Sequence, residues 1–351
     1  MSEEVCPKCN VPFSIKRTGY GAEVLVCPKC GYEVDKSKAG LSARVEAISL
    51  AKETEMGWEP SLTFFTLLLQ FTVGAYLTTL LVNYFSNLKE FASVPLSALW
   101  APALLGLIVS VGHGKNLKSL LRIATSLRSS YLGREVVLLG LFTLLLLLYP
   151  IRNMILPEQT VNIIHDYISV ATGILGLAAM VGIYVIPARP CWRHLYTPFS
   201  FILPAVISGP IFVQLSIGAA SNTVIQSTPF GLVVVGLAAS LSIIDLFLYQ
   251  KYRLYLKAQG DETRACLAKI DSKKSMYTLK VFLRLATAAL CIASIPLTSV
   301  FSVSVWLAYT TLYFALSFSA EAVSRGLFYL SVGAPVGEER FLKYAKGLSG
   351  V

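Results

Sequence analysis

Long runs of apolar residues separated by short polar stretches dominate the chain from residue 58 onward. Eight runs can be distinguished, at residues 62–85, 95–111, 136–151, 163–186, 199–219, 231–249, 281–296 and 303–316, with an extension of the last to residue 330 left open. A transmembrane helix needs roughly 20 mostly apolar residues. The pattern therefore predicts an all-α polytopic membrane protein with eight transmembrane helices.

The composition supports the same fold class. Of the 351 residues, 55% are hydrophobic and only 14% are charged, and the mean hydropathy is +0.64. A soluble domain carries about 25% charged residues, so this chain has too little charge to cover a water-facing surface. The basic residues behind the net charge of +10 lie mostly in loops between apolar runs. We therefore expect the chain to contact membrane lipid and not nucleic acid.

The basic residues fall almost entirely on one side of the eight predicted spans. We call side one the side of the N-terminal region, the second, fourth and sixth loops and the C-terminal tail, and side two the opposite side. Side one holds 28 of the 30 lysines and arginines, and side two holds Lys89 and Arg152. Cytoplasmic loops carry such an excess of basic residues. We therefore predict a multi-pass protein of the cell membrane with both termini in the cytoplasm.

The N-terminal region carries four cysteines with the spacing of a metal site. Cys6 and Cys9 form one CxxC pair, and Cys27 and Cys30 form a second pair 17 residues later, followed by Gly31. Two such pairs can close a tetrahedral four-thiolate zinc site, and a rubredoxin-like iron site is the less favoured alternative. The residues between the pairs are typical of a short β-hairpin around a GYG turn. We predict a zinc ribbon at 1–36, a helical linker at 37–57 and a membrane anchor domain at 58–351.

A group of polar residues is predicted to gather where the second and third spans meet side one. It consists of His113, Lys118, Arg134 and Glu135. A quinol site needs hydrogen-bond donors for the quinone oxygens and a titratable group that accepts a proton as electrons leave. The residues fit that chemistry, and the competing interpretation is an ordinary interfacial turn with basic side chains that reach toward water.

Other polar residues in the spans admit simpler interpretations. Glu321 and Arg325 are four residues apart and predict a self-paired structural unit, and we interpret Asp245 as structural. The chain has three histidines, which excludes a multi-haem protein but leaves open one haem held by His113 and His194.

The three cysteines outside the CxxC pairs have no partner at metal-ligand spacing. Cys191, Cys266 and Cys291 are predicted to be packing residues rather than ligands.

Four segments, in order along the chain, resemble the membrane anchor subunit of the dimethyl sulfoxide reductase family. They are WEPSLTFFTLLLQFTVGAYL, HGKNLKSLLRIATSLRSSYLGREVV, VIPARPCWRHLYTPFSFILPAVISGP and AEAVSRGLFYL. The resemblance covers about 295 residues from Trp58 onward and all eight predicted spans, and the first 55 residues lie outside it.

The resemblance implies a quinol site in which His113 and Glu135 handle the proton and Lys118 takes the place of a basic residue. It also implies that no haem is bound and that the partners are a ferredoxin-like iron–sulfur subunit and a molybdopterin catalytic subunit. The chain itself would then be an anchor that oxidises quinol, not the substrate-reducing subunit. With side one in the cytoplasm, the quinol site and the docked enzyme are expected there.

Two other functions remain open from the sequence. One is a polytopic transporter with a cytoplasmic zinc ribbon that docks a partner, although such a protein needs ionisable residues or broken helices near the bilayer midplane. The other is a membrane scaffold that recruits a partner through the ribbon and binds no small ligand.

Overall fold

The computed structural model describes residues 14–17, 23–30, 33–35, 60–113, 123, 125, 127–128, 130–155, 159–185, 190–297 and 300–331. The chain divides into two compact units, Met1–Gly57 and Trp58–Val351. Cys6, Cys9 and the predicted linker at 37–57 lie outside the described residues.

The N-terminal unit contains a small antiparallel sheet. Its strands are β1 Ser14–Arg17, β2 Glu23–Val26 and β3 Glu33–Asp35, in the order β1-β2-β3. Ile15 of β1 pairs with Leu25 of β2, and Val34 of β3 pairs with the same Leu25. β-branched residues favour such pairing, and the predicted hairpin between the CxxC pairs is confirmed.

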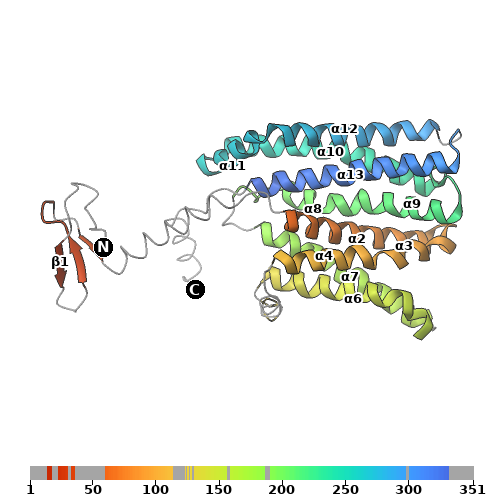
Figure 1. Ribbon diagram of the computed structural model, residues 1–351, viewed down its shortest axis with the longest axis horizontal. Helices are drawn as coiled ribbons and strands as arrows, with labels where there is room; N and C mark the ends of the chain where they lie inside the picture. The colour runs from red at the N-terminus through yellow and green to blue at the C-terminus, as the bar shows by residue number, and fades with distance from the viewer. Residues whose placement is uncertain are drawn as a thin grey trace. The chain divides into compact units, whose positions relative to one another are not determined.

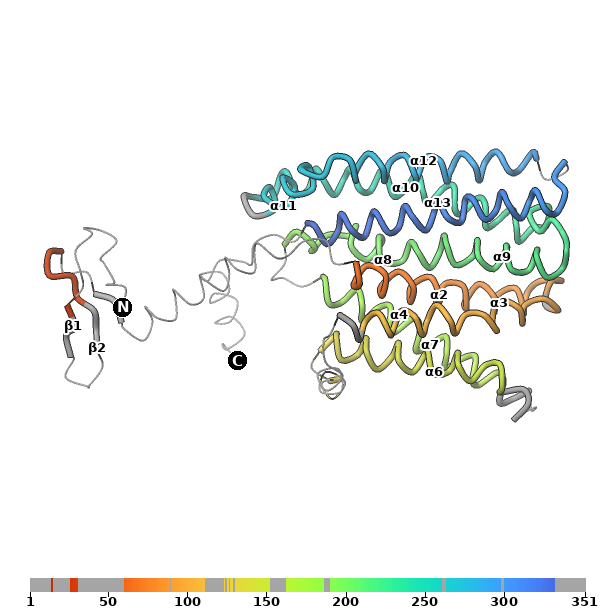
Figure 2. The backbone as a smooth tube through the Cα atoms, viewed as in Figure 1, coloured from red at the N-terminus to blue at the C-terminus, as the bar shows by residue number. Residues whose placement is uncertain are grey.

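The second unit is helical, and its long helices run side by side along one direction (Figures 1 and 2). The helices in chain order are α2 Pro60–Phe85, α3 Ser93–Ala98, α4 Trp100–His113, α6 Tyr131–Ile155, α7 Gln159–Tyr184, α8 Tyr196–Val206, α9 Ser208–Ser221, α10 Pro229–Ala258, α11 Asp261–Ser272, α12 Lys274–Leu297 and α13 Val303–Leu330, with short 3-10 turns η1 Lys89–Phe91 and η2 Ile225–Ser227. The described residues contain eight candidate membrane spans, which confirms the predicted fold class.

Two of the spans are broken helices. α3 and α4 together make the second span, and α8 and α9 make the fifth. The second break lies at Ile207, three residues before Pro210. Proline has no N–H and cannot donate to the carbonyl four residues earlier, here that of Val206. The fifth span is therefore interrupted at Ile207, between α8 and α9.

The broken span packs closely against α2. A Cβ atom on Gly74 would lie 1.9 Å from the carbonyl oxygen of Ala205, and one on Gly209 would lie 2.5 Å from the backbone nitrogen of Ala75. Small residues let helices approach each other in lipid. α2 is accordingly the central helix of the unit, and 78% of its most apolar stretch is buried.

Several helix boundaries differ from the prediction because charged residues lie inside helices. α12 begins at Lys274 rather than at residue 281, and α10 continues to Ala258 rather than ending at residue 249. The extension of the last span to Leu330, which the sequence left open, is confirmed. Lys280, Arg284 and Arg325, which the charge count assigned to loops and tail, are buried in the bundle. The asymmetry of the remaining basic residues is still strong, with 25 on side one against two on side two.

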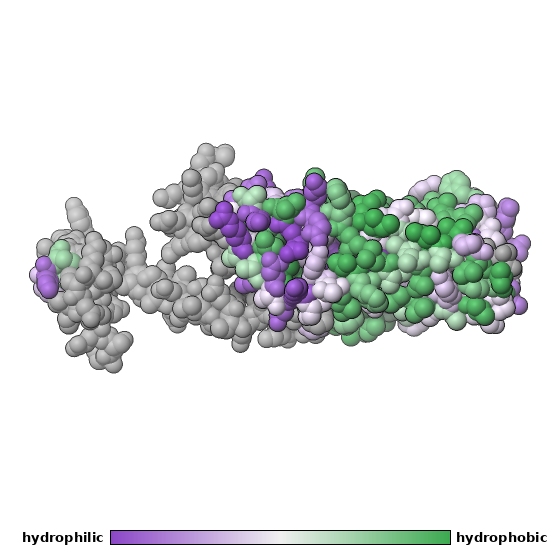
Figure 3. Space-filling model, turned by 90° about the horizontal axis from the view of Figure 1, so that it is seen from above, coloured by the Kyte–Doolittle hydropathy of each residue, from purple (hydrophilic) through white to green (hydrophobic). Residues whose placement is uncertain are grey.

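The surface of the unit has a broad hydrophobic band, and hydrophilic residues gather at one end of it (Figure 3). That end is side one, where α2 begins, α13 ends and the unpredicted amphipathic helix α11 lies (Figure 1). An even number of spans brings both ends of the unit to the same side.

Candidate functional site

Glu135 is a buried acid in the second turn of α6. It is 3% exposed and lies within electrostatic range of Tyr184 of α7 and Tyr329 of α13. The two phenol oxygens are 3.1 Å apart. No ion pair joins Glu135 to any residue in the part of the chain that the structure describes. Glu135 is thus a buried carboxyl within electrostatic range of two phenols.

Arg134, its neighbour in sequence, contacts a different part of the molecule. The guanidinium donates to the carbonyl oxygens of Leu127 at 3.1 Å and Arg128 at 2.9 Å, and it lies 5.1 Å from the ring centroid of Tyr131. Adjacent helical residues point about 100° apart, which explains the divergence. The structure does not bring Arg134 and Glu135 together.

The two remaining predicted quinol ligands lie at the limit of the described chain. His113 is the last residue of α4, but its side chain lies outside the described residues, as does all of Lys118. α4 packs against α6. The shared site and the alternative of a haem between His113 and His194 therefore stay predictions.

Four charged side chains meet inside the bundle, and we call them the charged cluster: Asp245 of α10, Lys280 and Arg284 of α12, and Glu321 of α13. Asp245 Oδ2 lies 3.1 Å from Lys280 Nζ and 2.8 Å from Arg284 Nε, and Arg284 Nη2 lies 3.0 Å from Glu321 Oε1. All four are at most 2% exposed. Tyr196 of α8 donates to Asp245 at 3.0 Å and accepts from Lys280 at 2.6 Å. The cluster joins α10, α12 and α13, and Tyr196 links α8 to it.

The predicted self-paired unit of Glu321 and Arg325 is wrong. Glu321 forms its ion pair with Arg284 on another helix. Arg325 donates instead to the side-chain oxygen of Gln70 at 3.0 Å and to the carbonyl of Ser200 at 3.1 Å, and its guanidinium lies 3.5 Å from the ring centroid of Phe201. Both residues therefore cross-link helices rather than stabilise α13 alone.

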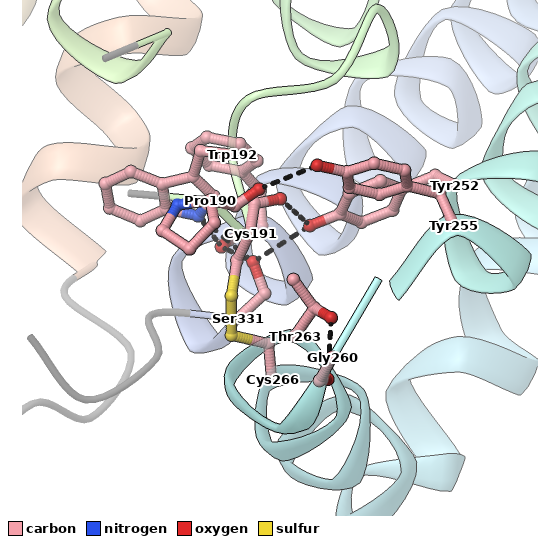
Figure 4. The surroundings of a disulfide bond; sticks show 10 residues. Pro190, Cys191, Trp192, Tyr252, Tyr255, Gly260, Thr263, Cys266 and Ser331 are labelled. Atoms are coloured by element: carbon pink, nitrogen blue, oxygen red, sulfur yellow. Dashed lines mark hydrogen bonds between the residues drawn. A yellow bond between two sulfur atoms is a disulfide. The ribbon is translucent and has the colours of Figure 1, made fainter. Parts of the chain in front are cut away.

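A disulfide at side one corrects the interpretation of two cysteines as packing residues. Cys191, in the loop before α8, is bonded to Cys266 of α11, with their Cα atoms 6.5 Å apart (Figure 4). Around it, the hydroxyl of Tyr252 donates to the carbonyl of Cys191 at 2.8 Å, and Trp192 Nε1 donates to Ser331 Oγ at 3.1 Å. The bond fixes the fourth and sixth loops to each other.

In the N-terminal unit, the second CxxC pair has a geometry that suits a metal knuckle. Cys27 directly follows β2 and is buried, and Cys30 closes a turn three residues later and is exposed. A knuckle of this kind offers two thiolates from one tight turn.

The sequence missed Tyr184, Tyr329, Lys280 and Arg284 as members of buried polar groups. Lys280 and Arg284 are four residues apart and therefore share a helix face. This spacing is the sequence signal that could have placed them together inside a helix. They precede or interrupt the apolar run and were interpreted as loop charges. The tyrosines carry no signal of their own, because tyrosine is ordinary at membrane interfaces.

Comparison with known proteins gives two matches. The family model of the DMSO reductase anchor subunit (DmsC) matches residues 55–330. The anaerobic dimethyl sulfoxide reductase chain YnfH of Escherichia coli (strain K12) is 30% identical over 200 residues, which cover 54% of this chain and 69% of that protein. The family match includes all eight candidate spans of the described residues and leaves out most of the N-terminal unit.

Proposed function

The chain belongs to the family of DMSO reductase anchor subunits, and from this premise we propose that it oxidises quinol in the membrane for an attached enzyme. Its partners are a molybdopterin catalytic subunit, which reduces the substrate, and a ferredoxin-like iron–sulfur subunit, which takes the electrons. The transporter and scaffold alternatives lose their support, because the family match extends through every candidate span of the described residues.

Glu135 is the observation that carries this proposal. Oxidation of a quinol to a quinone releases two electrons and two protons, and a nearby base must accept the protons. Glu135 is buried within the membrane unit and forms no ion pair with a described residue, so its carboxylate oxygens are available to accept a proton. His113 and Lys118 complete the proposed site by binding the quinone oxygens, and Arg134 holds the loop before α6 through its two carbonyl contacts.

The test is to replace Glu135→Gln in the complete complex. We expect menaquinol-dependent turnover to fall by about 10²–10⁴, the range that one positioned proton acceptor contributes. Turnover with a reduced viologen, which supplies electrons directly to the attached enzyme, should be unchanged. Glu90→Gln is the matched control, because Glu90 is an exposed acid at side two. Equal menaquinol turnover in both variants would refute the proposal.

The orientation of the chain is part of the proposal. The basic residues at side one favour the cytoplasm, and we place both termini and the docked enzyme there. Disulfides are rare in the cytosol except in hyperthermophilic organisms, so the Cys191–Cys266 bond favours the opposite placement or such an organism. Labelling of a cysteine introduced into the C-terminal tail decides between the two orientations, because only an external tail reacts with an impermeant maleimide in intact cells.

For the N-terminal unit we propose that Cys6, Cys9, Cys27 and Cys30 hold one structural zinc ion. The knuckle at Cys27 and Cys30 supports two of the four ligands, and the described sheet has too little apolar core to fold strongly by itself. Metal analysis of the purified full-length chain should find about one zinc per chain and little iron. Cys27→Ser should lower the zinc content, whereas Cys291→Ser should leave it unchanged. A red iron-containing chain would establish the rubredoxin-like alternative.

A further inference from the structure

The side-two end of the membrane unit holds a cavity large enough for a small molecule. Between α2 and α7 lies an apolar cavity of about 580 Å³, which we call the side-two pocket. Leu77, Leu81 and Phe85 of α2 line one wall, and Asp166, Tyr167 and Val170 of α7 line the other. Small-molecule sites have volumes of about 300–1,000 Å³ and combine apolar walls with a few polar groups.

The polar group of this pocket is Asp166, which is 5% exposed. The hydroxyl of Tyr76 donates to Asp166 Oδ1 at 3.0 Å, and His165 Nδ1 lies 3.6 Å from the same oxygen. Asp166 thus places a carboxylate in a mostly apolar lining, and Tyr76 and His165, which do not line the pocket, contact that carboxylate.

The contact of the second ring nitrogen of His165 decides which nitrogen faces Asp166. His165 Nε2 lies 3.1 Å from the carbonyl oxygen of Leu145, and a carbonyl only accepts, so Nε2 carries the hydrogen. In the neutral ring Nδ1 is then an acceptor that faces a carboxylate oxygen.

We propose that the side-two pocket binds the head group of a quinol. The hydroxyl groups of a quinol donate hydrogen bonds to Asp166, and its apolar tail leaves along Leu81 and Phe85, which are 58% and 83% exposed toward the lipid-facing surface. A phospholipid is a poorer occupant, because its phosphate would face Asp166 and the described lining residues include no lysine or arginine. A bare acyl chain would offer no hydrogen-bond donor to the Asp166 carboxylate that lines the pocket.

This site is distinct from the one proposed around Glu135, although it rests on the proposed function for the presence of quinol as a ligand. Asp166 lies 18 residues before Tyr184 on the same helix, a distance of about 27 Å at 1.5 Å per residue. The two sites are therefore at opposite ends of the bundle. The inference assigns binding only, with no electron transfer at side two.

Photolabelling tests the inference directly. The full-length chain is reconstituted in lipid nanodiscs with an azido-menaquinone, reduced to the quinol and illuminated, and the labelled peptides are identified by mass spectrometry. We expect label on peptides containing residues 77–85 or 163–170. Asp166→Asn should reduce that label about tenfold, as expected for a lost hydrogen bond to a charged group. Glu135→Gln should leave it unchanged.

A second variant keeps the test valid if Asp166→Asn fails to fold. Leu81→Trp changes an exposed, lipid-facing residue and fills the pocket without removing any buried contact, so it should also abolish the side-two label. Label that persists in Leu81→Trp, or that is displaced equally well by excess phospholipid and by unlabelled menaquinol, overturns the inference. Label at side two without label near residues 113–135 would refute the proposed function and leave this inference standing.

Discussion

Asp245 and Glu135 are both acids buried in the membrane unit, and their surroundings are opposite. Asp245 lies between two cations at 2.8 and 3.1 Å and accepts a hydrogen bond from Tyr196. Glu135 has two phenols near it and no ion pair to any described residue. Charge inside a membrane is costly, so a paired acid is suited to hold helices together. An acid without a cation can exchange a proton without breaking an ion pair.

The largest effect that the comparison predicts is on stability in the charged cluster. Asp245→Ala leaves Lys280 unpaired and Arg284 with one partner, and removal of one member of a buried ion pair costs about 3–5 kcal/mol. Asp271→Ala is the matched control, because Asp271 also pairs with an arginine, at 2.7 Å, but is half exposed. That variant should lose at most about 1 kcal/mol.

Chemical denaturation of the purified chain in detergent measures both variants. If Asp245→Ala cannot be purified, size-exclusion chromatography of a fluorescent fusion measures the fraction of folded chain in membranes. That fraction should be lower for Asp245→Ala than for Asp271→Ala. Equal losses in the two variants would show that the cluster does not stabilise the bundle.

The next effect concerns the disulfide, which fixes the loops beside the cluster helices α10 and α12. Cys266→Ser removes the bond and should lower the free energy of unfolding by about 2–4 kcal/mol. Dithiothreitol should destabilise the native chain to a similar extent and have no effect on the variant. If dithiothreitol destabilised Cys266→Ser as much as the native chain, reduction of the Cys191–Cys266 disulfide would not be the cause of the lower stability.

A smaller change in stability is expected at Glu135, in contrast to its effect on turnover. Glu135→Gln conserves shape and breaks no ion pair with a described residue, so the free energy of unfolding should change by less than about 1 kcal/mol. The same denaturation experiment measures it beside Asp245→Asn. If Glu135→Gln lowered the free energy of unfolding as much as Asp245→Asn does, Glu135 would be a structural acid. The contrast between Glu135 and Asp245 would then be wrong.

The smallest effect is a pH dependence at His194, in the loop before α8. Burial lowers the pKa of His194 below its usual value, and its Nδ1 accepts from the backbone N–H of Tyr196 at 3.0 Å. Since the folded chain binds the proton less readily than the unfolded chain, stability is complete above the unfolded pKa and falls as the pH drops through the folded one.

Thermal unfolding between about pH 7.5 and about pH 5, the range in which histidine titrates, measures this effect. The midpoint should decrease toward acid, and His194→Gln should remove part of that decrease. An identical pH profile in native chain and variant would contradict the assignment.

The sequence was sufficient to predict whatever depends on continuous apolar runs. The eight spans follow from the length of each run, and the hairpin follows from the residues between the CxxC pairs. The boundaries failed where a buried charge interrupted a run. Lys280 and Arg284 were assigned to the loop before the seventh span, yet both pair with Asp245 of α10. Such long-range pairing leaves no local pattern.

The site was predictable only in part for the same reason. Glu135 was found because it lies beside Arg134 at the start of a span. Tyr184 and Tyr329 were not found, because they are 145 residues apart and meet only when α7 packs near α13. The bond between Cys191 and Cys266 joins residues 75 positions apart, and neither position belongs to a recognisable spacing.

The Cys191–Cys266 disulfide also closes part of the chain into a covalent ring. Residues 191–266 form a covalent ring that crosses the membrane through α8 and α9, turns at 222–228 on side two and returns through α10. A protease that cuts once within this turn opens the ring without separating the chain. Such a nicked protein migrates as one species on a gel until it is reduced and then as two fragments. When protease is added to intact cells, the appearance of these fragments reports which compartment the turn faces.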